Sequence, residues 1–492
     1  MSTIKKLAGQ TAIYGLSTIV GRFLNYLLVP IQTRVFNLVQ FGTITGLYAY
    51  ITFLNVLLTH GMETAFFRFA EKHNHEKSIY STAMRSVLFF SLLFGCCTFL
   101  FASQIAALIH MGATAYYIKI VAVIIALDAI CAVPFALLRK ENNALRFALI
   151  KNAGIAVTIF LNVYFLLIGP YWLQENHRLL PFISNDVDPS VILIANLCGS
   201  LLTFVLLLPE IITIRFKRNR ALYQEMLEYA IPIMFIGFAG MINETLDRIM
   251  LVQLIPDQST ALRMNGIYGA NYKLSIVITL FIQAFKYAAE PFFFKHGKNS
   301  SKTQIYADVM QVFIVVCLSI FLMVMLNMRL FEQFIGVEFR EGLTIVPVLL
   351  WANIFLGIYY NLSIWYKLTD QTSKGAYIAI AGAIITVILN YMLIPILGYY
   401  GAALSTAICY GTMMVLGYAM GQKYYPIPYK VASFFGYSIL ALLLYGIGYY
   451  LQSNLAQNST YYLVGNGILV LFILIAVVLE KSKSRLHAEN SN

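Results

Sequence analysis

Long apolar stretches recur along the whole chain and are separated by short polar segments. Each stretch has about 20 residues, enough to cross the ~30 Å hydrocarbon core of a membrane as a helix. The fourteen stretches are residues 11–35, 42–60, 84–109, 115–138, 147–168, 190–209, 229–255, 266–291, 305–327, 344–366, 376–396, 399–420, 432–450 and 461–479. The pattern predicts an all-α polytopic membrane protein with about fourteen transmembrane helices.

Two neighbouring stretches carry charges in their interior. These charges are Glu244, Asp247 and Arg248 in one stretch, and Lys273, Lys286 and Glu290 in the next. A charge at the bilayer centre costs roughly 2.5–3.5 kcal/mol on the insertion scale, so such side chains are expected to face a protein interior or a wet cavity. We therefore predict that these two helices line a cavity.

Composition and charge agree with a membrane protein. The chain is 60% hydrophobic and 11% charged, whereas a soluble globular protein carries about 25% charged residues. With the N-terminus placed in the cytoplasm, the predicted inner segments and the two termini hold 24 of the 34 Lys and Arg residues, and the outer segments hold six. This positive-inside bias predicts that both termini are cytoplasmic. It also accounts for the net charge of +12 without nucleic-acid binding.

The chain carries no pattern typical of a metal site, a cofactor site or a catalytic domain. The six cysteines all lie in apolar stretches, and their spacing fits neither a disulfide framework nor a metal site. The sequence has no P-loop and no polar segment of 50 or more residues. We therefore expect no cofactor and no enzymatic activity.

An internal repeat divides the chain. The pattern AlaGly-x3-Thr-x2-LeuAsn occurs at residues 153–162 and again at 381–390, and Gly42-x5-Tyr48 matches Gly266-x5-Tyr272. An even number of helices in each repeat predicts two halves of the same orientation, related by a pseudo-two-fold axis along the membrane normal, as in many transporters. The predicted domains are six-helix lobes at 1–220 and 221–425, followed at 426–492 by two additional helices and a basic cytoplasmic tail.

Several local motifs, taken in order, resemble a known family. They are Gly21-Arg22, Pro30-x2-Thr33-Arg34-x6-Phe41-Gly42, Asp247-Arg248, and Gly266-x-Tyr268 followed by Lys273. With the 6+6+2 helix pattern, they resemble the polysaccharide-exporter or O-antigen (oligosaccharide-lipid) flippases of the multidrug/oligosaccharidyl-lipid/polysaccharide (MOP) superfamily. The resemblance covers the whole chain.

The resemblance implies a function. Such a protein would move an undecaprenyl-diphosphate-linked oligosaccharide from the cytoplasmic to the periplasmic leaflet of the bacterial inner membrane by alternating access. Its partners would be the lipid-linked oligosaccharide, the bilayer, and the glycan polymerase and glycosyltransferases of the same pathway. By analogy with related flippases, Arg22, Arg248 and Lys273 would hold the diphosphate. The chain departs from that pattern because no basic residue lies between Gly42 and His60.

The residues themselves indicate further roles. Amide and aromatic side chains can contact sugars, and the candidates are Asn25, Asn243, Asn271, Tyr272 and Gln283. Ionisable side chains can bind a coupling ion or form a gate, and the candidates are Asp128, Glu244, Asp247, Glu63, Lys286 and Glu290. We expect a monomer, because the predicted cavity is built within one chain.

Some alternatives stay open at this point. Glu244 and Arg248 are four residues apart and can form an intrahelical ion pair, while Asp247 and Arg248 are sequence neighbours expected to point to different helix faces and need other partners. For the whole protein, the alternatives are a cation-coupled multidrug antiporter of the same superfamily, a lipid II flippase, and an integral-membrane glycan polymerase or acyltransferase. Short outer loops and the internal repeat argue against an enzyme.

Overall fold

The computed structural model describes residues 15, 19–72, 76–110, 114–169, 187–213, 219–296, 303–453, 455 and 459–489. These residues form helices and turns and no β-strand. By contacts the chain divides into two compact units, of which one comprises 1–273, 336–341 and 379–405 and the other comprises 274–335, 342–378 and 406–492.

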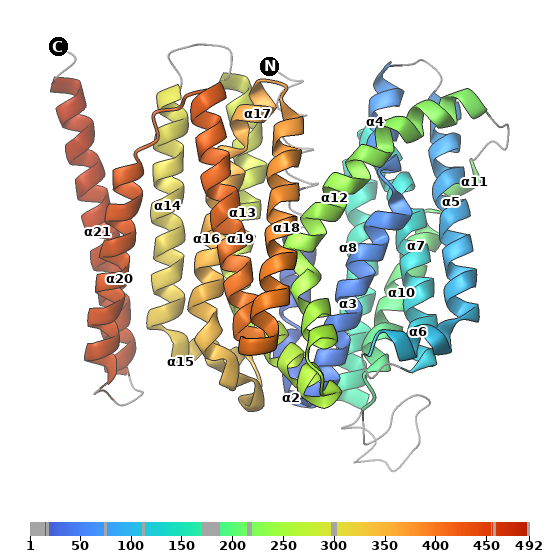
Figure 1. Cartoon of the computed structure of the whole chain (residues 1–492), viewed down its shortest axis with the longest axis horizontal. Coiled ribbons are helices and arrows are strands. Elements are labelled where there is room, and N and C mark those ends of the chain that lie inside the picture. The colour runs from blue at the N-terminus through green and yellow to red at the C-terminus, as the bar shows by residue number, and fades with distance from the viewer. Residues whose placement is uncertain are drawn as a thin grey trace. The chain divides into compact units, whose positions relative to one another are not determined.

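The first unit contains the helices of the N-terminal half and parts of four later elements. Its elements are α2 (Val29–Val35), α3 (Leu38–Thr59), α4 (Met62–Lys72), α5 (Glu76–Leu100), α6 (Ala102–Leu108), α7 (Ala115–Lys140), α8 (Ala144–Val163), a π-helix (Tyr164–Ile168), α10 (Ser190–Leu206), α11 (Leu208–Ile212), α12 (Arg220–Leu254), and parts of α13 (Gln258–His296), η4 (Val337–Ile345), α18 (Thr372–Leu397) and α19 (Tyr399–Tyr424). Within this unit α7 packs against α5 and α10, and α3 packs against α12 (Figure 1).

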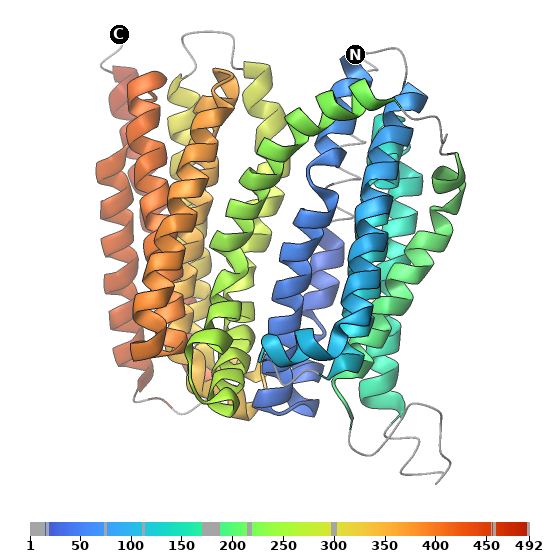
Figure 2. The same cartoon turned by 45° about the vertical axis from the view of Figure 1, so that its right-hand side comes forward.

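The second unit contains the remaining helices and the other parts of α13, η4, α18 and α19. Its own elements are α14 (Thr303–Leu326), α15 (Met328–Phe331), a 3-10 turn (Glu332–Phe334), α16 (Val346–Leu362), α17 (Ile364–Leu368), α20 (Val431–Ser453) and α21 (Ser459–Glu489). The C-terminal pair α20 and α21, coloured orange-red and red in Figure 2, packs side by side with the yellow α14.

Eleven helices in the described part of the chain are long and apolar enough to cross a membrane. Ser190–Leu206 is apolar but has 17 residues. The charged α13 is not among the eleven, although its 39 residues give a length of about 58 Å. The predicted all-α membrane architecture is confirmed. The count of fourteen stays a prediction, because part of the first predicted stretch lies outside the described residues.

Local sequence signals explain where several helices begin. Asn37 and Gln40 form a reciprocal capping box at the start of α3, and the side chain of Asn219 accepts a hydrogen bond from the Leu222 amide at the start of α12. α12 continues through Pro232. Proline lacks the amide hydrogen and crowds the preceding turn, and both views show that α12 bends along its length (Figures 1 and 2).

Helices α3 and α13 cross at two glycines that the sequence repeat matches. A Cβ added at Gly42 would lie 1.9 Å from the carbonyl oxygen of Leu262, and a Cβ added at Gly266 would lie 2.1 Å from the carbonyl oxygen of Leu38. The contact is reciprocal, because each glycine meets the carbonyl four residues before the other glycine. Only glycine permits such a close approach of two backbones, so this crossing fixes how α13 is placed against α3.

Candidate functional site

Two of the three charged residues in the middle of α12 are buried. The side chains of Asp247 and Arg248 are only 4% and 11% exposed, and Arg248 Nη1 lies 3.2 Å from Asp247 Oδ1. The expectation that these neighbours need partners on different faces is therefore wrong for Asp247, since the two side chains pair with each other. The long Arg side chain folds back along the helix, and Asp247 also accepts a hydrogen bond from the Arg248 amide at 2.8 Å.

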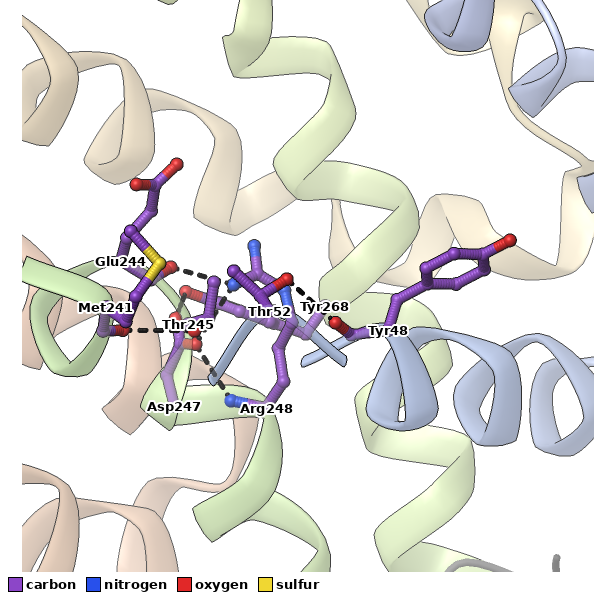
Figure 3. A network of polar contacts seen from close by, with 8 residues as sticks. All are labelled: Tyr48, Thr52, Met241, Glu244, Thr245, Asp247, Arg248 and Tyr268. Atoms are coloured by element: carbon purple, nitrogen blue, oxygen red, sulfur yellow. Dashed lines mark hydrogen bonds and ion pairs between the residues drawn. The ribbon is translucent and has the colours of Figure 1, made fainter. Parts of the chain in front are cut away.

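Two tyrosines of α13 complete this cluster. The hydroxyl of Tyr268 donates a hydrogen bond to Asp247 Oδ2, and Tyr268 is fully buried. The guanidinium carbon of Arg248 lies 4.4 Å from the ring centroid of Tyr272 and 5.6 Å from that of Tyr268. A cation above an aromatic face within about 6 Å is stabilised by the ring quadrupole. Figure 3 shows Asp247, Arg248 and Tyr268 converging from the two helices.

Glu244 takes no part in this ion pair. Arg248 Nη1 donates instead to the backbone carbonyl of Glu244 at 2.8 Å. The Glu244 side chain is exposed, and in Figure 3 its carboxylate points away from Arg248. The alternative of an intrahelical Glu244–Arg248 ion pair is therefore not realised.

Lys273 supplies a second cation next to Arg248. Its side chain is partly buried, and Arg248 is close enough to act on it by charge repulsion. Lys273 has no hydrogen bond or ion pair to any residue that the structure describes. Asp247 therefore pairs with Arg248 alone among the described residues, and the charge of Lys273 is left uncompensated there, which makes this region able to accept an anion.

Arg22 belongs to a different group of charges. Its side chain is exposed, and Arg22, Arg139 and Glu63 all act electrostatically on Lys151 of α8. Glu63 of α4 forms an ion pair with Arg139 of α7. No contact among the described residues joins Arg22 to Arg248. The three residues predicted to hold the diphosphate thus fall into two groups, with Arg248 and Lys273 together and Arg22 apart.

The amide side chains predicted to contact sugars differ in their surroundings. Asn243 is buried and donates to the Ala379 carbonyl of α18 at 3.1 Å, while its side-chain oxygen accepts from Thr386 at 3.3 Å. Asn271 is also buried and donates to the carbonyls of Ile267 and Phe339. These bonds hold helices together.

The remaining predicted sugar contacts lie closer to solvent. Asn25 is exposed, and Gln283 and Tyr272 are partly exposed. Of these three, only Tyr272 contacts the Arg248 cluster. Asn25 and Gln283 are therefore not brought to that cluster by any contact in the described part of the chain.

Asp128 of α7 lies in a separate polar group. Ser200 of α10 donates a hydrogen bond to Asp128 Oδ1 at 2.7 Å, and Asn196 donates to the hydroxyl of Tyr48 at 3.3 Å. Asp128 is close enough to act electrostatically on that Tyr48 hydroxyl. It forms no ion pair with a basic side chain that the structure describes, so this carboxyl group has a single polar partner.

The predicted gate residues of α13 lie beyond the Arg248 cluster in the sequence. Lys286 Nζ lies 5.2 Å from the ring centroid of Tyr360. The side chain of Glu290 lies outside the described residues. Within the described chain, no group of three or more His, Cys, Asp or Glu side chains gathers as a metal site would require.

Sequence reasoning gave no role in the site to three residues that these groups need. They are Tyr268, Arg139 and Ser200. Tyr268 and Tyr272 are four residues apart on one helix and share a face, which is the signal that could have predicted an aromatic wall for Arg248. The pairings of Arg139 with Glu63 and of Ser200 with Asp128 join different helices, and no local pattern indicates them.

Comparisons with known proteins agree on the type of protein. A family model described as polysaccharide biosynthesis protein matches residues 7–297. No curated protein matches the chain. Among solved structures, the lipid II flippase MurJ in an inward closed conformation is similar with a TM-score of 0.75 and 14% identity, over 96% of this chain and 99% of that chain.

A second solved structure has a similar fold. It is the inward-facing conformation of a multidrug resistance MATE family transporter of the MOP superfamily, with a TM-score of 0.61 and 13% identity, over 84% of this chain and 94% of that chain. At these identities the likeness shows the fold alone.

Proposed function

The chain belongs to the polysaccharide biosynthesis protein family, and we propose that it is a flippase that moves an undecaprenyl-diphosphate-linked oligosaccharide across the membrane. The proposed direction is from the cytoplasmic to the periplasmic leaflet of a bacterial inner membrane, with both termini in the cytoplasm. The protein acts as a monomer and not as an enzyme, and the two six-helix lobes at 1–220 and 221–425 rock against each other.

One observation carries this proposal. Arg248 and Lys273 are partly buried next to each other, and among the described residues Asp247 pairs with Arg248 while Lys273 has no ion pair. A diphosphate brings the negative charge that this group of two cations lacks. Arg248 supplies a planar donor that matches phosphate oxygens, and Lys273 supplies a compact charge.

The surrounding residues prepare Arg248 for this role. Asp247 is held by Tyr268, and Asp247 in turn holds Arg248. The ring of Tyr272 covers the guanidinium and adds a flat surface against which a sugar can pack. Asp247, Tyr268 and Tyr272 therefore orient the cation.

The motion and its driving force follow from the same residues. Helix α12 carries Arg248, contains Pro232 and is bent along its length. Such a bend is where the helix can flex during transport. Moving one charge through 100 mV is worth about 2.3 kcal/mol, so about two uncompensated phosphate charges leaving a negative interior gain roughly 4–5 kcal/mol. Asp128, which forms no ion pair with a described basic side chain, is the proposed site of any coupling proton or cation.

The decisive experiment measures flipping in proteoliposomes with a fluorescent undecaprenyl-diphosphate oligosaccharide. Lys273→Gln is the key variant, because it removes a cation without breaking an ion pair of the described structure. We expect at least a tenfold loss of rate in Lys273→Gln and in Arg248→Ala. The matched control is Arg263→Ala, which removes an arginine whose ion pair with Glu341 is half exposed, and its rate should stay near that of the wild type.

The other outcomes decide between functions. Unchanged flipping in Lys273→Gln and Arg248→Ala would make both residues structural and remove the proposed anion site. No glycan flipping by the wild type, together with ion-dependent efflux of an organic cation, would assign the chain to the multidrug antiporters. A flipping rate that depends on pH in the wild type but not in Asp128→Asn would identify Asp128 as the coupling site.

A further inference from the structure

A small pocket opens between α13, α16 and α17 in the second unit. Its cavity volume is about 20 Å³, so it has room for one compact polar group and not for a drug-sized molecule. Ile282 and Phe285 form part of its wall, and two lysines line it, Lys286 from α13 and Lys367 from α17. The pocket shares no residue with the Arg248 cluster, so a ligand can bind here whether or not the protein is a flippase.

The charges of this pocket have one sign. Lys286 is exposed with its ammonium 5.2 Å from the ring centroid of Tyr360, and Lys367 is half-buried in the last turn of α17. No acidic side chain is among the described residues that line the pocket. Two ammonium groups on one small space repel each other unless an anion lies between them.

A buried amide gives a second, independent indication. Asn361 is 5% exposed and lines the same pocket, and its side-chain Nδ2 has no hydrogen-bond partner in the described chain. A buried donor without an acceptor costs about 1–3 kcal/mol. The neighbouring Ser363 hydroxyl donates to the Tyr360 carbonyl at 2.6 Å, and no described hydrogen bond joins its oxygen to the Asn361 amide. An oxygen ligand in the pocket would accept from the amide.

We propose that this pocket binds a phosphate group. Phosphate is a compact anion with several acceptor oxygens, and it can take charged bonds from Lys286 and Lys367 and the amide bond from Asn361 together. Lys367 lies at the end of the apolar span Val337–Leu368, which is the depth at which lipid headgroups meet a membrane protein. The phosphate of an anionic lipid and free inorganic phosphate share this chemistry.

The test uses the full-length protein in a neutral detergent and measures binding by isothermal titration. The probes are short-chain phosphatidic acid, inorganic phosphate and short-chain phosphatidylcholine. We expect phosphatidic acid to bind the wild type, and Lys286→Gln and Lys367→Gln each to weaken its binding at least tenfold. Asn361→Leu should weaken it about threefold. Lys423→Gln is the matched control, because Lys423 also lies over a tyrosine ring, at 5.5 Å from that of Tyr424, but does not line the pocket.

Each outcome has a defined meaning. Equal binding of phosphatidic acid and inorganic phosphate identifies free phosphate as the occupant, and binding of phosphatidic acid alone identifies a lipid headgroup. Equal binding of phosphatidylcholine, no binding of either phosphate probe, or unchanged affinity in both lysine variants would overturn the site. If Asn361→Leu does not fold, the two lysine variants decide alone. The assay contains no glycan, so failure of the flippase function would leave its result unaffected.

Discussion

Two tyrosines at matched positions of the repeat have opposite surroundings. Tyr48 of α3 accepts a hydrogen bond from Asn196 and lies near the carboxyl group of Asp128. Tyr272 of α13 covers the guanidinium of Arg248. The repeat places each tyrosine six residues after the glycine at which α3 and α13 cross.

The difference shows that a repeated sequence determines the position of a residue along its helix but not the partners of its side chain. The glycine crossing determines where the two tyrosines lie along their helices. Their partners come from other helices, α7 and α10 for Tyr48 and α12 for Tyr272, and these partners carry opposite charge. The same position of the repeat thus lies beside a carboxyl group in the first half, at Tyr48, and beside a guanidinium in the second half, at Tyr272.

The largest expected effect comes from removing the carboxylate of the cationic group. Asp247→Ala leaves Arg248 buried without its ion pair and Tyr268 without its acceptor. We expect the free energy of unfolding to fall by about 3–5 kcal/mol, measured by sodium dodecyl sulfate titration followed by circular dichroism. Asp247→Asn, which keeps an acceptor for Tyr268, is the control and should lose less. An Asp247→Ala protein as stable as the wild type would contradict a buried ion pair.

The glycine crossing gives the next effect. Gly42→Ala and Gly266→Ala each place a methyl group against a backbone carbonyl, so each should cost about 1–3 kcal/mol or more of the free energy of unfolding. Because both changes push the same two helices apart, the double variant should cost less than the sum of the single ones. Gly240→Ala is the control, because an added Cβ there meets nothing within 4 Å. Strict additivity would show that the two positions are independent.

Changing each of the two tyrosines tests its own contact, the ring of Tyr272 and the hydroxyl of Tyr48. Tyr272→Leu should reduce the free energy of unfolding by about 0.5–2 kcal/mol through loss of the cation–π contact. Tyr48→Phe keeps its ring and should lose about 0.5–1.5 kcal/mol, the worth of one hydrogen bond. The diagnostic step is to repeat Tyr272→Leu in an Arg248→Gln background. If the ring acts through the guanidinium, the effect of Tyr272→Leu should shrink there, and an undiminished effect would assign it to packing.

The smallest expected effect is at Asp128. Asp128→Asn keeps an acceptor for the Ser200 hydroxyl and breaks no ion pair of the described structure, so the free energy of unfolding should change by about 1 kcal/mol or less. The same unfolding titration measures it. A loss as large as that of Asp247→Ala would reveal a charged partner of Asp128 and would remove the contrast between the two groups.

The sequence predicted the membrane architecture and the charged turn of α12 because both depend on local patterns. Apolar length indicates a span, and a charge within it is unusual enough to notice. The sequence could not predict that Arg248 pairs with Asp247 and not with Glu244. In the structure Asp247 is also hydrogen-bonded to Tyr268, which another helix brings to it. Likewise, Glu63 meets Arg139 through the packing of α4 and α7, and no spacing along the chain encodes it.

The contact between Gly42 and Gly266 has the form of an isologous interface, the kind through which two identical subunits form a symmetric dimer. Here both surfaces belong to one polypeptide, yet each still presents a glycine and the carbonyl four residues before it. A half-length chain that paired with itself would satisfy this contact with a single glycine. In a chain made of two fused halves, a glycine is required at both positions, 42 and 266. Neither position can gain a side chain while the other helix keeps its path.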